Sequence, residues 1–169
     1  IVREGGAVPA TVAVVNGKLQ VGCSAEDLKA LATGPGVLKV SRRDLPLALA
    51  RRTLGATTVS GTLIGCELAG IRVFATGGIG GVHRGVDQTW DISADIPELA
   101  KSSVAVVSAG AKSILDLPKT LEALETAGVT VVGFDTDEFP AFFTPKSGLK
   151  APYRVNNPAE MANAMRAKW

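Results

Sequence analysis

The sequence predicts an α/β protein with three layers, in which helices cover both faces of a mostly parallel central sheet. Short apolar runs alternate with helical patterns along the chain, and strands that are separated by helices usually pair in parallel. A glycine-rich loop also follows one of the apolar runs directly, as at ligand sites of α/β sheets. With 169 residues, 46% of them hydrophobic, the chain can bury a sizeable core, so one domain over residues 1–169 is expected.

The first half of the chain predicts a β-hairpin and three helices. Two β-like runs flank Asn16-Gly17, a strong signal for a two-residue hairpin turn. Ser24 and Asp27 form a capping-box pattern that starts a helix. A later segment carries small residues and leucines at helical spacing, so a tightly packed helix is expected there. The expected elements are strands at Ala10–Val15 and Lys18–Gly22 and helices at Ser24–Ala32, Asp44–Leu54 and Thr57–Ala69.

The second half predicts three apolar strands and three helices. Leu117, Leu121 and Leu124 share one helical face, and Asn157 followed by Pro158 is a typical helix start. The expected strands are Ile71–Ala75, Val104–Ser108 and Val129–Phe134, and the expected helices are Ile96–Lys101, Leu117–Ala127 and Ala159–Lys168.

Composition argues against several classes of partner. The formal net charge is +2, which gives no strong electrostatic case for binding nucleic acid or a membrane surface. Cys23 and Cys66 are far apart in the sequence, so no disulfide framework is indicated and a reducing cytoplasm fits. No apolar run approaches the roughly 20 residues that cross a bilayer, and no signal peptide is recognised. We expect a cytoplasmic protein without a nucleic-acid or membrane partner.

The segment Thr76–Asp95, TGGIGGVHRGVDQTWDISAD, is the most informative one because it holds five glycines and the single histidine of the chain. Glycines at this density oppose regular helix or strand. The loop does not complete G-x-G-x-x-G, since His83 stands where the third glycine belongs, and Gly110-Ala111-Lys112-Ser113 is not a phosphate-binding P-loop. Cofactor sites of the common nucleotide-binding types are therefore disfavoured.

Lys112 is a candidate nucleophile. It follows an apolar strand within Ser108-Ala109-Gly110-Ala111-Lys112, where small residues allow close backbone approach and leave the amine little water. A lysine so placed can form a Schiff base with a carbonyl substrate. The alternative is a surface lysine at a helix start.

Two further groups of residues could bind ligands. Asp91 and Asp95 lie four apart after the glycine loop, and their hard oxygens suit Mg²⁺ or Mn²⁺; the alternative is helix capping. His83-Arg84 could bind phosphate or orient a water, or be structural. The run Lys39–Asp44 places three cations and a hydroxyl before a helix, which favours either an anion site or a solvated charge cluster.

These motifs together resemble the pseudouridine-5′-phosphate glycosidase family, which includes indigoidine-synthase-A-like proteins. The motifs that carry the resemblance stand in order along nearly the whole chain: GGAVPATVAV, KVSRRDL, GATTVSGT, TGGIGGVHRG, DISAD, VVSAGAKSILDLPKTLEALE and DEFPAFF. The resemblance implies an α/β/α homotrimer that reversibly cleaves pseudouridine 5′-phosphate to uracil and ribose 5-phosphate with a divalent metal, usually Mn²⁺.

The resemblance also implies a role for particular residues. Lys112 corresponds to the nucleophile and Asp91 to the metal carboxylate. The residues implied to contact or line the substrate site are Lys39, Val59 through its backbone N–H, Ser93, Ala94, Asp95 and His83. This set suits the chemistry, because a C-glycoside has no leaving-group oxygen to protonate and the two-carboxylate glycosidase mechanism does not transfer. An amine that attacks the exposed C1′ of the ring-opened sugar forms an electron-poor iminium for C–C cleavage.

The chain departs from the family pattern at both ends. The family's proton-donor glutamate lies before the position of Ile1, and its glycine-rich C-terminal segment lies beyond Trp169. We therefore expect a partial domain that turns substrate over far more slowly than an extended version. Two alternatives stay open, namely an inactive sugar-phosphate-binding module and another Schiff-base lyase or aldolase.

Overall fold

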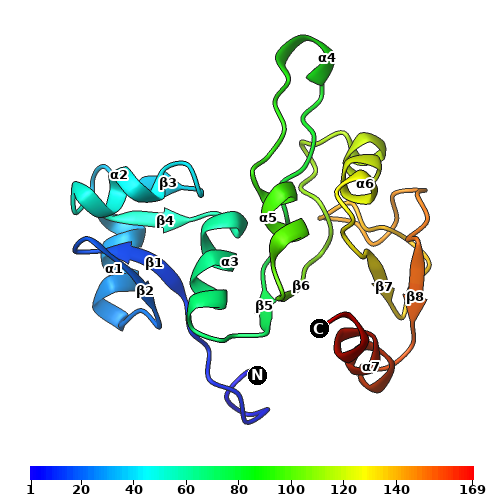
Figure 1. The fold of residues 1–169 in the computed structure, drawn as a ribbon, viewed down its shortest axis with the longest axis horizontal. Coiled ribbons are helices and arrows are strands. Elements are labelled where there is room, and N and C mark those ends of the chain that lie inside the picture. The colour runs from blue at the N-terminus through cyan, green and yellow to red at the C-terminus, as the bar shows by residue number, and fades with distance from the viewer. The chain divides into compact units, whose positions relative to one another are not determined.

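A computed structural model describes residues 1–169. The α/β class is confirmed, since helices and strands alternate along the chain (Figure 1) and three of the five strand pairs are parallel. Contacts divide the chain into two compact units, Ile1–Ile71 and Arg72–Trp169, and each is described by itself. The expectation of a single domain over residues 1–169 stays a prediction.

The first unit contains a four-stranded sheet in the order β2-β1-β4-β3. Its strands are β1 (Val12–Val15), β2 (Lys18–Val21), β3 (Leu38–Val40) and β4 (Gly55–Thr57). The predicted hairpin is confirmed, because Asn16 at φ 50° and Gly17 at φ 78° join β1 to β2; a type I′ turn needs positive φ at both positions. β1 also pairs antiparallel with β4, and β3 pairs parallel with β4.

Three helices accompany this sheet: α1 (Ala25–Thr33), α2 (Leu45–Ala50) and α3 (Val59–Leu68). The capping box is confirmed, as the Ser24 hydroxyl accepts the Asp27 N–H and the Asp27 carboxylate accepts the Ser24 N–H. α2 ends earlier than predicted, because Arg52 adopts φ 55° and the N–H of Thr53 turns back to the carbonyl of Ala48.

The core of the first unit joins strands and helix α2. Val14 and Val40 are fully buried and pack with Leu45 and Ala48. Helix α3 is buried on most sides, as its pattern of small residues predicts, with Leu63 at its centre. β3 and β4 were not predicted, because their sequences, Leu-Lys-Val and Gly-Ala-Thr, do not form the apolar runs by which the strands of the second half were recognised.

The second unit holds two parallel strand pairs. β5 (Val73–Ala75) pairs with β6 (Ala105–Val107), and β7 (Val132–Phe134) pairs with β8 (Tyr153–Val155). Hydrogen bonds divide the strands of the chain into three sheets, of four, two and two strands. Beyond Ala75 the chain continues as the glycine-rich loop, which makes isolated bridges instead of a ladder. Strand β8 was not predicted from the sequence.

The helices of the second unit largely begin where the sequence places them. They are α4 (Val86–Thr89), α5 (Asp95–Lys101), α6 (Leu117–Thr126) and α7 (Pro158–Lys168), of which α4 was not predicted. Asn157 caps α7 by accepting the N–H of Glu160, as its sequence pattern indicates. None of the helices combines the length and apolarity required to traverse a lipid bilayer. Both cysteines are free, and burial raises the pKa of the Cys66 thiol.

Gly61 tests the packing of α3. A Cβ at this position would lie 2.7 Å from the carbonyl oxygen of Val40 and 3.2 Å from Cβ of Thr57. We expect Gly61→Ala to lower the free energy of unfolding by about 1–3 kcal/mol, because overpacking outweighs the better helix propensity of alanine. Urea denaturation measures it. Leu68→Ala, at a side chain of the same helix that is 79% exposed, is the control and should change it by less than about 0.5 kcal/mol; a stabilised Gly61→Ala would contradict the packing.

Candidate functional site

The glycine loop, residues 76–82, runs beside the segment 107–112 that carries Lys112. The two backbones alternate as donor and acceptor, and a parallel bridge joins Ile79 to Ala111. Their hydrogen bonds run from Thr76 N to Val107 O at 2.9 Å, Ala109 N to Gly77 O at 3.1 Å, Ile79 N to Gly110 O at 3.0 Å and Lys112 N to Ile79 O at 3.1 Å. The backbone of Lys112 is therefore held by the glycine loop.

Glycine is required in this loop because other side chains of the protein lie directly against its backbone. A Cβ on Gly80 would lie 2.7 Å from Oδ2 of Asp95, and one on Gly78 would lie 2.6 Å from Cδ2 of Phe142. A Cβ on Gly81 would overlap the side chain of Thr120. The sequence indicated close backbone approach at this loop, and the structure shows which groups make that approach.

Ser93, Ala94 and Asp95 are attached to the glycine loop at the start of α5. The N–H of Gly80 donates to Oδ2 of Asp95 at 2.8 Å, and the N–H of Ser93 donates to the carbonyl of Gly81 at 2.9 Å. Asp95 is only 3% exposed, whereas Ala94 is exposed and Ser93 is half-buried. Asp95 thus orders the loop from within the protein, and a contact between its side chain and substrate stays a prediction.

His83 and Asp91 pair with each other on the two segments that flank α4. The N–H of His83 donates to the carbonyl of Asp91 at 3.0 Å, and Nδ1 of His83 lies 3.8 Å from Oδ2 of Asp91. The Asp91 side chain is 61% exposed and caps no helix. No group of three His, Cys, Asp or Glu side chains gathers to hold a metal. This donor set fits only a hard cation that keeps most of its water.

Lys112 is exposed, so the expectation that its amine has little water is wrong for this chain. Ala111, which forms the bridge to the glycine loop, is fully buried. Gly110 is buried as well and adopts φ 87°, whereas Lys112 lies at the surface. The structure places its side chain where a ligand in solution can reach it.

Lys39 and Val59 lie in the first unit, near one end of its parallel strand pair. Lys39 is an exposed residue of β3, and Val59 is the first residue of α3. The N–H of Thr58 donates to the carbonyl of Val40 at 2.9 Å, which joins the end of β3 to the start of α3. The structure therefore brings these two predicted residues to the same edge.

In the run Lys39–Asp44, Ser41 already has an acceptor within the chain. Both the N–H and the hydroxyl of Ser41 donate to Oδ2 of Asp44, at 3.0 and 2.7 Å. These bonds, the backbone one foremost, lower the pKa of the Asp44 carboxyl. Asp44 thus occupies the two donors of Ser41, and whether the run binds an anion through its cations stays a prediction.

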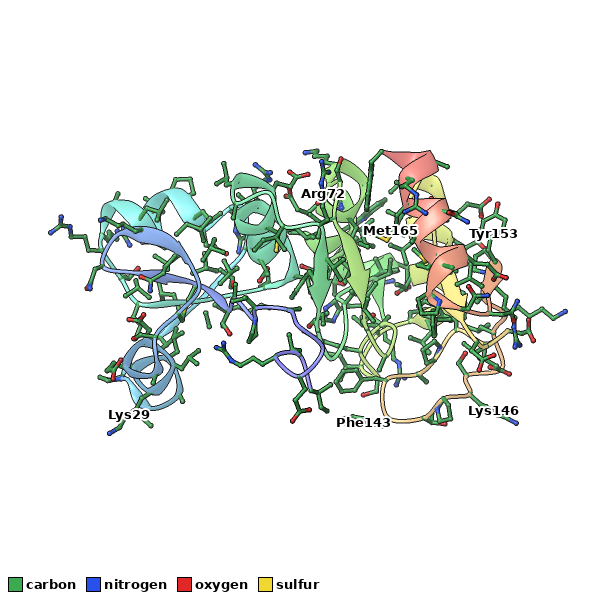
Figure 2. All side chains as sticks on the ribbon, turned by 90° about the horizontal axis from the view of Figure 1, so that it is seen from below. Lys29, Arg72, Phe143, Lys146, Tyr153 and Met165 are labelled. Atoms are coloured by element: carbon green, nitrogen blue, oxygen red, sulfur yellow. The ribbon has the colours of Figure 1, made fainter.

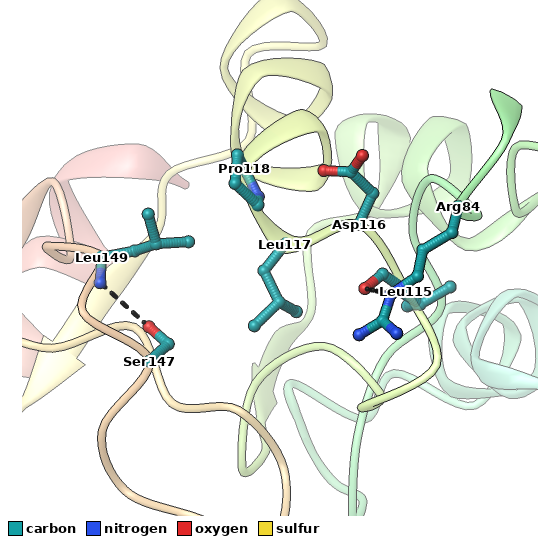
Figure 3. Close-up of a pocket in the computed structure, with 7 residues that line it drawn as sticks. All are labelled: Arg84, Leu115, Asp116, Leu117, Pro118, Ser147 and Leu149. Atoms are coloured by element: carbon teal, nitrogen blue, oxygen red, sulfur yellow. Dashed lines mark hydrogen bonds between the residues drawn. The ribbon is translucent and has the colours of Figure 1, made fainter. Parts of the chain in front are cut away.

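A pocket of about 350 Å³ lies beside the start of α6 (Figure 3) and was not predicted from the sequence. Its polar residues already have partners in the protein. The Arg84 guanidinium donates to the carbonyls of Leu115 and Ser113, at 3.3 and 3.1 Å. Asp116 lies 2.9 Å from the ammonium of Lys119, whose hydrogen bond lowers the pKa of the Asp116 carboxyl. We therefore place the candidate site at the glycine loop.

The fold and the site define the class: this is an α/β protein with a lysine beside a glycine-rich loop. Comparison with known sequences identifies the family. The chain belongs to the indigoidine synthase A-like family, whose sequence profile matches residues 1–169. Among solved structures, the prealnumycin C-glycosynthase AlnA in complex with ribulose 5-phosphate is 47% identical, with a TM-score of 0.94 over 99% of this chain and 55% of that one. An indigoidine synthase A-like protein from Thermotoga maritima is 41% identical, with a TM-score of 0.91 over 98% and 55% of the two chains.

Relatives named pseudouridine-5′-phosphate glycosidase include proteins from Solibacter usitatus and Caldanaerobacter subterraneus subsp. tengcongensis. The protein from Solibacter usitatus is 62% identical over 168 residues, which are 99% of this chain and 56% of the relative. The protein from Caldanaerobacter subterraneus subsp. tengcongensis is 59% identical over 169 residues, all of this chain and 55% of the relative. The chain thus spans about half the length of the relatives that it matches.

Thr120 ties α6 to the glycine loop, and its replacement tests that connection. Its fully buried hydroxyl accepts the N–H of Val82 at 3.0 Å and donates to the carbonyl of Asp116 at 2.7 Å. We expect Thr120→Val to lower the free energy of unfolding by about 1–3 kcal/mol, since it leaves a buried N–H without an acceptor. Thr120→Ser keeps the hydroxyl and should lose clearly less in the same denaturant titration. A Thr120→Val variant as stable as the wild type would show that this hydrogen bond does not stabilise the connection.

Proposed function

We propose that the protein acts as a pseudouridine-5′-phosphate glycosidase, a C-glycosidase that reversibly converts pseudouridine 5′-phosphate to uracil and ribose 5-phosphate. The observation that carries this proposal is the identity of 59–62% over essentially the whole chain to relatives of that name. Such a reaction needs a nucleophilic amine. Lys112 is an exposed lysine whose backbone is hydrogen-bonded to the glycine-rich loop. The proposal concerns the protein to which these 169 residues belong.

In the synthetic direction, the amine of Lys112 attacks the aldehyde carbon of open-chain ribose 5-phosphate, and water leaves as the imine forms. C5 of uracil then attacks this carbon, so that the new C–C bond forms while the electron pair of the C=N bond moves to nitrogen. Loss of the proton from C5 restores the uracil ring. Closure of the sugar ring through its 4-hydroxyl releases the Lys112 amine, and cleavage follows the same steps in reverse.

The other predicted residues would bind and orient the sugar phosphate. The ammonium of Lys39 and the backbone N–H of Val59, at the start of α3, are suitable donors for a phosphate dianion. Ser93, Ala94 and Asp95 would contact the sugar from the start of α5, and His83 would line the site from the glycine loop. The attachment of these loop residues to one another supports this assignment, because reacting groups need fixed positions.

A divalent cation, Mn²⁺ by the family resemblance, would be held by Asp91 and would supply positive charge beside the substrate oxygens. One exposed carboxylate fits weak binding with most ligands from water. We also assign a cytoplasmic homotrimer on the same resemblance. Sedimentation of the purified protein measures its mass in solution.

A second candidate reaction is the synthesis of a C-glycoside with an acceptor other than uracil. It is supported by the 47% identity to a prealnumycin C-glycosynthase that was solved with ribulose 5-phosphate. Incubation with ribose 5-phosphate in the presence and absence of uracil separates the two, since only the glycosidase reaction predicts that uracil is consumed.

Replacement of Lys112 tests the nucleophile. Borohydride reduction in the presence of ribose 5-phosphate should attach the sugar covalently to the peptide that contains Lys112, and Lys112→Ala should abolish the adduct because no other amine has this position. Peptide mass spectrometry measures it. Lys119→Ala, at another lysine of the same unit, is the control and should keep the adduct. An adduct that persists in Lys112→Ala, or one found on Lys39 or Lys119, would refute the assignment.

Replacement of Asp91 tests the cation. We expect Asp91→Ala to abolish Mn²⁺ binding and to leave the melting temperature unchanged, because its side chain is exposed and lies at a loop base. Titration of free Mn²⁺ by electron paramagnetic resonance measures binding without reference to activity. Asp87→Ala removes another exposed carboxylate from the same loop and should bind Mn²⁺ as the wild type does. Unchanged binding in Asp91→Ala would place the cation elsewhere.

A further inference from the structure

Phe142 holds an unusual backbone conformation beside the segment that carries Lys112. Its φ of 66° lies in the left-handed region, which a bulky residue rarely adopts. Its N–H donates to the carbonyl of Ala109 at 3.2 Å, and an antiparallel bridge joins the preceding residue, Ala141, to Gly110. Phe142 thus bonds to Ala109, three residues before Lys112, and its neighbour Ala141 pairs with Gly110, two residues before Lys112.

The ring of Phe142 lies against the glycine loop. A Cβ on Gly78 would stand 2.6 Å from Cδ2 of this ring, and one on Gly77 would stand 3.7 Å from its Cε2. The ring of Phe143 meets it edge to face at a centroid distance of 4.5 Å. Phe143 itself is 82% exposed and is labelled in Figure 2. Phe142 therefore contacts both backbones that hold Lys112.

The loop that carries Phe142 is closed at its base by Glu138. Oε2 of Glu138 accepts the N–H groups of Ser147 and Gly148, at 3.1 and 3.0 Å. The hydroxyl of Ser147 donates to the carbonyl of Phe139, whose side chain is buried. A strained backbone persists only where its surroundings determine it, and these bonds supply that determination.

We propose that Phe142 is a positioning residue for Lys112. It acts through two routes that end at the same residue: the backbone of Ala109 and Gly110, which leads directly to Lys112, and the glycine loop, whose Ile79 carbonyl accepts the Lys112 N–H. Phe142 does not itself take part in bond formation. This role rests on the proposed function only in that Lys112 forms the imine.

The first test measures the hydrogen bonds that Phe142 is inferred to hold. In Phe142→Ala, amide hydrogen exchange at Lys112 and Ile79 should accelerate by about 10-fold or more, since local opening becomes easier. Tyr153→Ala, the control at an exposed ring of the same unit that does not touch Phe142, should leave both rates unchanged. This readout needs neither substrate nor activity. Unchanged exchange at Lys112 in a folded Phe142→Ala would overturn the proposal.

The second test measures the chemistry of Lys112. The maximal rate of imine trapping with ribose 5-phosphate should fall about 10- to 100-fold in Phe142→Ala, because small displacements of a reacting group have effects of this size. The half-saturating sugar concentration should stay the same, and Phe142→Tyr should restore the rate because it keeps the ring. A fall that Tyr153→Ala reproduces, or that Phe142→Tyr does not reverse, would overturn the proposal.

A double-mutant cycle tests the contact between the ring and Gly78. Gly78→Ala should slow trapping in the wild-type background, because its Cβ displaces the Phe142 ring. It should have a smaller further effect in Phe142→Ala, where the ring is absent and only a contact of 3.1 Å with the Gly110 carbonyl oxygen remains. Fully additive effects would overturn the route through the glycine loop. If the wild-type protein forms no imine at Lys112, the proposed function fails, whereas the exchange measurement still decides the role of Phe142.

Discussion

The structure of the second unit depends on the close packing of the glycine loop. Within seven residues this loop exchanges backbone hydrogen bonds with the segment before Lys112 and meets the carboxylate of Asp95, the hydroxyl of Thr120 and the ring of Phe142. A side chain at Gly78, Gly80 or Gly81 would displace one of these groups. His83 directly follows this loop, and its N–H donates to the carbonyl of Asp91. The packing of the loop therefore also fixes the geometry of the site.

Burial separates the polar residues of the site into two kinds. Asp95 and Thr120 are buried and bond to the backbone of the glycine loop, so they determine where the loop lies. Lys112 and Asp91 are exposed and remain accessible to a ligand. The buried groups thus hold the loop in place, and the exposed groups carry charge at the surface.

Local signals predicted many elements of the fold. The Asn16-Gly17 turn, the capping box at Ser24 and the cap at Asn157 act within a few residues, so their physics can be read directly from the chain. The apolar face of α6 and the small-residue packing of α3 were equally visible. The three-residue strands β3, β4 and β8 were missed, because their pairing energy comes from distant partners and not from their own composition. The division of the strands into separate sheets depends on such pairing as well.

The sequence by itself determined the α/β class, the family and the residue types of the candidate site, because turns, caps and motifs are short-range patterns. Only the tertiary structure decided which of these residues are buried. It showed that Lys112 is exposed although the neighbouring Ala111 is fully buried. It also showed that Asp44 accepts both donors of Ser41 and that Phe142 packs on Gly78, 64 residues away in the numbering. Contacts at such separation follow from the path of the whole chain, which no local pattern encodes.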